Sequence, residues 1–438
     1  MFDILYFGLE GDLERPTHLY TGKAILMDPI KLGRQLRTAR ETRGLSQQTA
    51  ADALGVPRTA ITQIELGKRS VSTLELAKLA ECYLRPVSHF FEEAVEAENE
   101  DVLVALHRIA PGLEQDSDVS EQVDRCVALC REGVVLEKIL GLGPRSGPPM
   151  HNVRVPRTAG QAVTQAEQLA DEERNRLNIG NAPLADVSEL IGSQGIWASG
   201  IELPRDMSGL FLRHPSIGLA ILVNASHPRG RKRFSYAHEY AHALLDREQT
   251  ISISSTDNSA ELVETRANAF AAAFLMPRTG VSEVLRTLDK GLPARHEQTI
   301  FNAASGGHIQ AEFRPPAKSQ KITYKDVALV AHHFGVSYQA ALYRLKSLRH
   351  VSQPDSVGLL EQEHFGIQYL RFLNKLDELE KPEQRQYWDR ELRSEIAHLA
   401  IEAYRREDIS RGRLLELSKM LGIDGKTLLV LAEAAHEG

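Results

Sequence analysis

A His-Glu-x-x-His pattern at residues 238–242 constrains this 438-residue chain more than any other feature of its sequence. The segment Phe234–Leu245 contains no Gly or Pro and carries apolar residues at helical spacing, which predicts a helix. On such a helix His238 and His242 project from one face, so both imidazoles can bind one zinc ion. Glu239 then lies beside the metal, where it can accept a proton from bound water.

A catalytic zinc site needs a third protein ligand, and two candidates follow the first helix. Residues 261–277 are rich in Ala and end in Pro277, which predicts a second helix. Glu261 and Glu264 lie three residues apart near its start, so either could complete a site of two His and one Glu. The alternative for each is a solvated acid that the helix dipole favours at a helix start.

These motifs resemble the ImmA/IrrE family of metallopeptidases over roughly residues 156–350. Beside the His-Glu-x-x-His pattern, the matching segments are Glu264, Ala267-Asn268, Phe270-Ala271, Leu275-Met276-Pro277, Asn224, Arg233-Phe234, Arg176-Leu177-Asn178-Ile179-Gly180, Pro183-Leu184-Ala185-Asp186-Val187 and Gly195-Ile196. The resemblance implies a zincin-like fold, Zn²⁺ as cofactor and Glu239 as the catalytic base. It also implies that His238, His242 and Glu264 are the metal ligands, with Glu261 as the second choice for the third position.

Residues 30–85 contain four short helical segments separated by tight breaks, the organisation of a helix-turn-helix. The expected helices are Ile30–Arg43, Leu45–Leu54 with Ser46 as its N-cap, Pro57–Glu65 and Ser72–Tyr83. The segment resembles the XRE (Cro/cI-type) DNA-binding family in Gly44-Leu45-Ser46-Gln47, Ala50, Leu54-Gly55-Val56, Ile61, Ile64-Glu65 and Gly67-Lys68. From Lys31 to Arg85 there are ten Lys or Arg and five Asp or Glu, hence a net charge of +5 in a chain of −7. Such a basic segment is expected to bind DNA.

The resemblance implies that Pro57–Glu65 is the recognition helix in the major groove. Its candidates to reach base edges are Arg58, Thr59, Thr62 and Gln63. The candidates to bind phosphate are Gln47, Arg43 and Lys68. Ile61 and Ile64 are expected in the core, and Arg40 and Glu65 are expected to form an internal ion pair. Because a domain of this size reads only a few base pairs, we expect a homodimer on a palindromic double-stranded DNA operator.

The remaining sequence predicts a mainly α protein with a small β-sheet, in the α+β class. Strands are expected at Gly195–Ile201, Gly209–Arg213 and Gly218–Asn224. The expected domains are an N-terminal extension (1–27), the helix-turn-helix (28–93), an acidic helical linker (94–155), the peptidase domain (156–350) and a helical C-terminal region (351–438). Residues 322–348 also look like a helix-turn-helix, but we expect them to pack against the catalytic helices.

Two parts of the expected linker have distinctive compositions. Between Phe91 and Gln122 there are ten acidic residues and one basic residue, which predicts a solvated spacer; the alternative is a decoy that competes with DNA. The stretch from Gly141 to Pro156 contains four Pro and three Gly, which predicts a hinge accessible to proteases.

The composition of the chain predicts the cellular compartment in which the protein acts. The chain is 42% hydrophobic and 25% charged, it has no run of 18 apolar residues, and its acidic N-terminus does not resemble a signal peptide. With three cysteines in the chain, these features predict a cytoplasmic protein without membrane contact.

Two functions are consistent with these motifs. In the first, a DNA-binding transcriptional regulator carries a zinc peptidase that is latent until a stress or mobile-element signal. The peptidase then cleaves a protein substrate, which is either the chain itself or a partner repressor or antitoxin. In the second, an autorepressor or antitoxin uses the peptidase-like domain only to bind a partner or to sense a signal. A Glu239→Gln substitution separates them, because only the first function needs the carboxylate.

Overall fold

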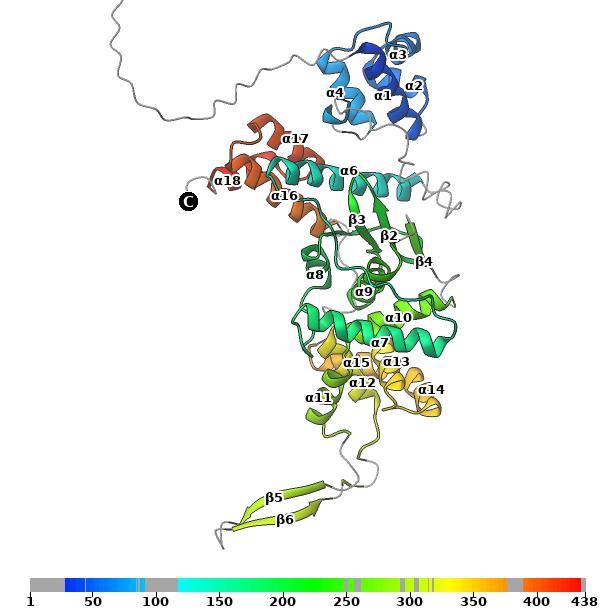
Figure 1. Ribbon diagram of the computed structural model, residues 1–438, viewed down its shortest axis with the longest axis vertical. Helices are drawn as coiled ribbons and strands as arrows, with labels where there is room; N and C mark the ends of the chain where they lie inside the picture. The colour runs from blue at the N-terminus through cyan, green and yellow to red at the C-terminus, as the bar shows by residue number, and fades with distance from the viewer. Residues whose placement is uncertain are drawn as a thin grey trace, which may run out of the picture. The chain divides into compact units, whose positions relative to one another are not determined.

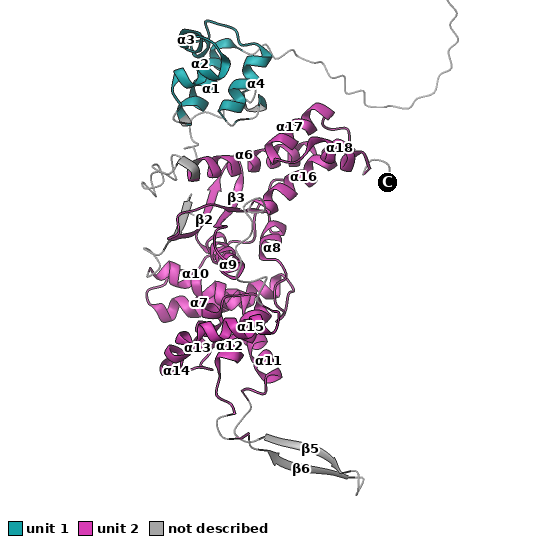
Figure 2. Ribbon diagram, turned by 180° about the vertical axis from the view of Figure 1, so that it is seen from behind, with its two compact units in different colours: residues 1–94 teal, residues 95–438 magenta. Residues whose placement is uncertain are grey.

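The chain, seen here in a computed structural model, forms two compact units, Met1–Ala94 and Val95–Gly438, which we describe separately (Figure 2). The structure describes residues 28–90 except 44, 84 and 86, 117–247, 251–255, 261–291, 296–302, 307–316 except 314, 319–375 and 389–434. The expected N-terminal extension and residues 91–116 of the acidic run lie outside the described residues.

The first unit is all helical, as the sequence predicted. Its elements are α1 (Pro29–Thr42), α2 (Gln47–Leu54), α3 (Arg58–Glu65), α4 (Thr73–Cys82) and the short 3-10 helix η1 (Val87–Phe90). Local sequence sets the helix ends. The Ser46 hydroxyl accepts a hydrogen bond from the backbone N–H of Thr49, and Ser72 forms a capping box with Glu75. Gly55 ends α2 with a φ of 69°, a conformation that glycine adopts without strain.

The core of this unit depends on close contact between α1 and α3. Leu36, Ile61 and Ile64 are almost fully buried, which confirms the two isoleucines as core residues. A Cβ at Gly33 would lie only 2.5 Å from the carbonyl oxygen of Ile64, so the two helix backbones touch at this point. The small core therefore relies on a glycine as well as on apolar side chains.

The second unit is built on a mixed four-stranded sheet. Its strands are β1 (Ile196–Ile201), β2 (Met207–His214), β3 (Gly218–Asn224) and β4 (Ile251–Ser255). They lie in the order β1-β3-β2-β4, with β1 parallel to β3 and the other pairs antiparallel. The three strands expected from the sequence are present, and β4 is an additional edge strand. A second, two-stranded antiparallel sheet joins β5 (His296–Asn302) and β6 (Gly307–Phe313).

One face of the four-stranded sheet packs against the helix that carries the predicted zinc motif, and it shares a core with the helices around that helix. Leu219, Ile221 and Val223 of β3 point to this face, in a core shared with the helices. These helices are α7 (Ala159–Arg176), α8 (Val187–Ser193), α9 (Arg229–Leu245), α10 (Leu262–Leu275), α11 (Arg278–Thr287), α12 (Tyr324–Phe334), α13 (Tyr338–Ser347), α14 (Gln353–Glu361) and α15 (Glu363–Phe372). Figure 1 shows α9 against the sheet, α7 and α10 beside it, and α12 to α15 beyond them.

The opposite face of the sheet is covered by helices from both ends of the second unit. They are α6 (Ser117–Ile139), α16 (Arg390–Arg405), α17 (Arg411–Leu421) and α18 (Gly425–Ala434) (Figure 1). Trp197, Leu210 and Leu222 share a second apolar core with them. The sequence analysis placed Glu121–Leu140 in a linker, whereas in the structure this helix covers the sheet. The apolar side chains of α6 are buried against the strands, and the spacing of apolar residues in the sequence did not predict this contact.

The stretch from Gly141 to Pro156 also differs from its prediction as a hinge. The Arg145 guanidinium lies 3.4 Å from the centroid of the Trp197 ring and is paired with Glu137 and Glu395. The backbone N–H of His151 donates to the carbonyl of Leu244 at 2.9 Å. The proline- and glycine-rich stretch is therefore tied to the second unit along its length.

The second helix-turn-helix-like segment packs as the sequence analysis expected. In α12 and α13, Val327, Ala331 and Leu342 are buried in the core that also contains the zinc-motif helix. The Arg344 guanidinium of α13 donates to the carbonyl of Met276 at 2.9 Å, directly after α10. The fold class is confirmed as mainly α with a small β-sheet. None of the described helices combines the length and apolar character needed to cross a bilayer.

Candidate metal centre and nucleic-acid interface

The structure brings His238, His242 and Glu264 together between α9 and α10. All three are buried, and their ligand-capable atoms lie within 4.8 Å of one another. The Nε2 atoms of the two imidazoles are 3.3 Å apart. The Glu264 carboxylate lies 3.1 Å from His238 Nε2 and 3.4 Å from His242 Nε2. Two imidazole nitrogens and one carboxylate therefore converge on one point, as in a three-ligand zinc site.

Each imidazole is held from behind by an oxygen. His238 Nδ1 lies 3.0 Å from Asn268 Oδ1, and His242 Nδ1 lies 3.0 Å from Asp246 Oδ2. Arg266 in turn donates to Asp246 at 2.7 Å. When Nδ1 donates its proton to these oxygens, Nε2 keeps its lone pair for a metal. The donor set and its supporting hydrogen bonds thus fit a zinc ion.

The pKa shifts at the site reflect the same arrangement. Burial would lower the pKa of His242, but its hydrogen bonds with Asp246 and Glu264 outweigh burial and raise this pKa to about 10. Burial would raise the pKa of Glu264, but its hydrogen bonds with the two histidines lower it to about 2. The Glu264 carboxylate is therefore held ionised beside the imidazoles, and a metal ion binding there would compete with the proton of His242.

Glu239 lies next to the ligands and is fully buried. Strand β2 passes directly against it at Gly209, where an added Cβ would lie 2.8 Å from Glu239 Oε1 and 3.1 Å from the carbonyl oxygen of Leu222. Any larger residue would displace the carboxylate. The sequence analysis gave Gly209 no role, although a glycine inside a strand is a known sign of close approach. The same region has an irregular register between β2 and β4.

The other candidates of the sequence analysis lie elsewhere. Glu261 is the exposed N-cap residue of α10 and does not belong to the ligand group. Tyr324 and His308 lie downstream in the sequence and are further side chains that could stabilise an oxyanion. Tyr324 packs against Phe365 with ring centroids 5.8 Å apart, and the side chain of His308 lies outside the described residues. Asn268 and Asp246 were not predicted as supporting groups, and only the contact with the imidazoles identifies them.

In the first unit, a buried ion pair joins α1 to α3. Arg40 donates to both carboxylate oxygens of Glu65, at 2.5 and 3.0 Å, which confirms the expected internal pair. The Gln47 amide donates to Glu65 at 2.9 Å, and its carbonyl accepts from the Thr62 hydroxyl at 3.2 Å and from Arg58 at 3.4 Å. Gln47, predicted to bind phosphate, therefore also links the first turn of α2 to α3.

The side chains predicted to meet DNA lie on the surface of this unit. Four of them, Arg58, Thr59, Gln63 and Lys68, are exposed, and Gln47, Thr62 and Arg43 are half-buried. The base-edge candidates all lie on α3, whose opposite side is fixed by Ile61 and Ile64. A short helix with an apolar inner side and polar outer residues suits insertion into a major groove.

Comparisons with known families agree with both domain assignments. The helix-turn-helix family model matches residues 36–89, and the IrrE N-terminal-like domain model of the M78 peptidases matches residues 197–304. The protein is thus of the class that joins DNA-binding to a metallopeptidase-type domain. In particular, the chain contains an XRE-type helix-turn-helix domain fused to an ImmA/IrrE-like domain, as its motifs predicted.

Comparisons over the whole chain add little. No curated protein matches it. Among solved structures, the crystal structure of Bacillus thuringiensis PlcR in complex with the peptide PapR7 and DNA aligns with 93% of this chain and 98% of that chain. The sequence identity is 12% and the TM-score is 0.15, so this alignment carries no argument about fold or function.

Proposed function

We propose that this DNA-binding regulator uses its ImmA/IrrE-like domain as a zinc-dependent peptidase. Its substrate would be the chain itself or a partner repressor or antitoxin, cleaved after a stress or mobile-element signal. The observation that carries the proposal is the convergence of His238, His242 and Glu264 within 4.8 Å, with Glu239 buried beside them. Cleavage would change repression, because the same chain carries the DNA-binding domain.

Each residue of the site would have its own chemical role. His238, His242 and Glu264 would hold zinc, which when bound supplies a Lewis acid and a water of lowered pKa. Glu239 would accept the proton of the attacking water and pass it to the leaving amine. Asp246 and Asn268 would fix the imidazole orientations, because they hydrogen-bond the outer nitrogens.

DNA recognition would use α3 in the major groove. Arg58, Thr59, Thr62 and Gln63 would read base edges, while Gln47, Arg43 and Lys68 would hold the phosphate backbone. Since one such domain reads only a few base pairs, the bound species would be a homodimer on a palindromic operator. The exposure of Arg58, Thr59 and Gln63 supports this assignment.

A Glu239→Gln variant tests the peptidase. Wild type and variant should each contain one zinc ion per chain, since Glu239 is not a ligand. Expressed in cells before and after DNA damage, the wild type should yield fragments of itself or a partner, detected by intact mass. Cleavage by the variant should be about 10²–10⁴-fold slower.

Glu261→Gln, a change of the same chemistry at an exposed residue, serves as the control. Equal fragmentation in both variants would refute the catalytic role of Glu239.

A second candidate function is favoured by the burial of the site. Glu239 and His242 have no exposed surface in this conformation. A site so enclosed also suits an autorepressor or antitoxin in which the domain only binds a partner or senses a signal. In that case zinc would bind, Glu239→Gln would leave repression and fragment masses unchanged, and no signal would produce cleavage.

A further inference from the structure

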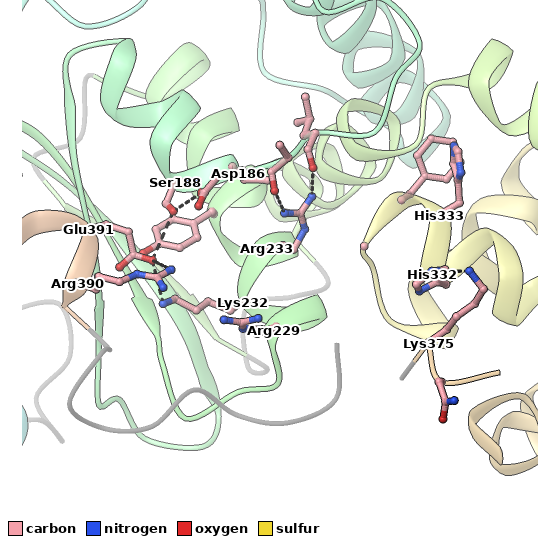
Figure 3. Close-up of a pocket in the computed structure, with 17 residues that line it drawn as sticks. Asp186, Ser188, Arg229, Lys232, Arg233, His332, His333, Lys375, Arg390 and Glu391 are labelled. Carbon is pink, nitrogen blue, oxygen red and sulfur yellow. Dashed lines mark hydrogen bonds and ion pairs between the residues drawn. The ribbon is translucent and has the colours of Figure 1, made fainter. Parts of the chain in front are cut away.

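A cavity of about 640 Å³ lies in the second unit, at the N-terminal end of α9 and away from the metal ligands (Figure 3). Five separate parts of the chain line it: residues 184–188 at the start of α8, the start of α9, the end of α12, residues 374–375 after α15, and residues 390–391 at the start of α16. Its volume is within the range of small-molecule sites in proteins. Neither the helix-turn-helix nor the peptidase assignment uses this cavity.

The wall of the cavity is strongly basic in a chain whose net charge is −7. Among the described residues that line it, two are acidic, Asp186 and Glu391. The basic lining residues are Arg229, Lys232, Arg233, Lys375 and Arg390. Figure 3 shows Arg229 and Lys232 on one side and His332 and Lys375 on the other, so that positive groups border the space from opposite walls. Clefts lined by one sign of charge concentrate the field and attract ions of opposite sign.

The acidic residues are committed to the protein itself. The Asp186 carboxylate caps α8 by accepting from the backbone N–H groups of Ser188 and Glu189, at 2.9 and 3.1 Å. The Glu391 carboxylate accepts from Lys232 at 3.3 Å and from the Ser188 hydroxyl at 3.5 Å. Both carboxylates thus have hydrogen-bond partners within the wall. Among the described lining residues, five Arg or Lys side chains outnumber the two acids, so the lining has a net positive charge.

Two of the basic side chains are held in structural contacts, and the other three are exposed. Of these three, Lys375 Nζ lies 3.5 Å from His332 Nε2, and the Arg390 guanidinium lies 4.0 Å from the Glu391 carboxylate. Lys232 is buried against Glu391, and Arg233 donates to the carbonyls of Ala185 and Leu184. Arg229, Lys375 and Arg390 are exposed and come from three different segments of the chain. Three cations on a framework fixed by buried hydrogen bonds can surround an anion without large rearrangement.

We propose that this cavity binds a small organic anion that carries two or more negative charges. Phosphorylated metabolites and dicarboxylates share this chemistry. Arg229 and Arg390 would bind the charged oxygens through their guanidinium groups, and Lys375 would add a third cation from the opposite wall. The cavity volume leaves room for an organic body as large as a nucleoside.

The position of the cavity would connect such a ligand to both faces of the sheet. Arg229 begins α9, the helix that carries His238 and His242, and Tyr236 of this helix also lines the cavity. Arg390 begins α16, which covers the opposite face. An anion held by Arg229 and Arg390 would tie the two helices together. The consequence for cleavage rests on the proposed peptidase function, whereas ligand binding itself does not.

Calorimetric titration of the full chain tests the proposal. The probes are ADP, fructose 1,6-bisphosphate and succinate, with adenosine as the uncharged comparison. At least one of the three anions should bind, and uncharged adenosine should not. The anion with the highest affinity shows whether the site prefers phosphate or carboxylate. Arg229→Gln combined with Lys375→Gln should weaken binding by about tenfold or more. Arg405→Gln combined with Lys419→Gln removes the same charge elsewhere in the second unit and should leave binding unchanged.

Hydrogen exchange locates the ligand without any substitution. The bound anion should protect backbone amides in residues 184–188 and 229–236 of the wild type. Absence of binding by all three anions, equal binding of adenosine, undiminished binding by the Arg229 and Lys375 variant, or protection confined to other segments would each overturn the proposal. Because the readout is binding, loss of peptidase activity in Glu239→Gln would leave this outcome untouched.

Discussion

The two candidate sites of this chain are built in opposite ways. The candidate base-reading residues lie on the outer side of one short helix, α3, and most of them are exposed. The candidate metal ligands come from α9 and α10 and are buried, with 5% exposure or less. At an exposed site only the helix has to be held in place, so each side chain adds a modest amount to the binding free energy. A buried polar site must satisfy every group at once, because an uncompensated charge in the interior is costly. Loss of one residue should therefore have graded effects in the first unit and severe effects in the second.

The largest effect expected from this comparison is the loss of metal from the buried site. Glu264→Ala removes the only carboxylate of the ligand group, so zinc content after purification should fall to background. Glu261→Ala, at the exposed start of the same helix, should keep full zinc content. Metal analysis measures both, and operator binding measured in parallel should be unaltered. Full zinc in Glu264→Ala would show that another residue completes the site.

The buried ion pair between Arg40 and Glu65 allows a similar test within the first unit. Glu65→Ala leaves Arg40 and Gln47 without their shared acceptor, and loss of one partner of a buried ion pair costs about 3–5 kcal/mol. Hydrogen exchange of the α3 amides should become much faster, while zinc content stays unchanged. Glu41→Ala, which breaks an exposed pair with Arg37, should have a far smaller effect. If both variants behaved alike, burial would not be what distinguishes polar groups in this chain.

Substitutions on the exposed side of α3 should have graded consequences. Arg58→Ala should weaken operator binding by about 1–3 kcal/mol and relax the preference at one base pair. Lys68→Ala should weaken all sequences alike and reduce the slope of log affinity against log salt by about 1. Fluorescence anisotropy over a range of salt concentrations separates the two. The same slope in Lys68→Ala as in wild type would remove this residue from the phosphate contacts.

The smallest effect concerns pH and the turn that leads into α9. Burial, reinforced by Arg231, lowers the pKa of His227 from its ordinary value near 6.5 to about 4. The unfolded chain then binds a proton more readily than the folded one between these values, so stability should fall as the pH drops from 6.5 towards 4. Thermal unfolding at pH 7 and pH 5 measures the change, and His227→Gln should reduce it. His398→Gln, at an exposed position of α16, should retain the full pH dependence.

Much of the fold followed from local patterns. Ser46 was expected to cap a helix because its hydroxyl can accept a free backbone N–H, and it does so; Ser72, expected only to begin a helix, is also an N-cap. The strands expected at Gly195–Ile201 and Gly218–Asn224 match β1 and β3 to within one residue. The Arg40–Glu65 pair followed from the family resemblance. Helix caps and strands of this kind depend on residues that are close together in the sequence, so the sequence alone predicts them.

Other features could not be read from neighbours. α6 was assigned to a linker because its acidic surroundings masked the side that covers Trp197 and the sheet. The Gly- and Pro-rich stretch after it looked like a hinge, yet Arg145 fastens it through Glu137, Glu395 and the Trp197 ring. Contacts between residues 250 positions apart, such as Arg145 with Glu395, leave no periodic trace in the sequence.

By itself the sequence determined the class of this protein, a helix-turn-helix joined to a His-Glu-x-x-His helix, and it named candidate residues for binding DNA and metal. Helical spacing is enough to place His238 and His242 on one face. Only the tertiary structure brought Glu264, and not Glu261, within 4.8 Å of both histidines, placed Gly209 against Glu239, and gathered five basic side chains around a cavity. The physical reason is that these arrangements depend on which distant segments share a buried surface, and that choice is made only when the whole unit packs.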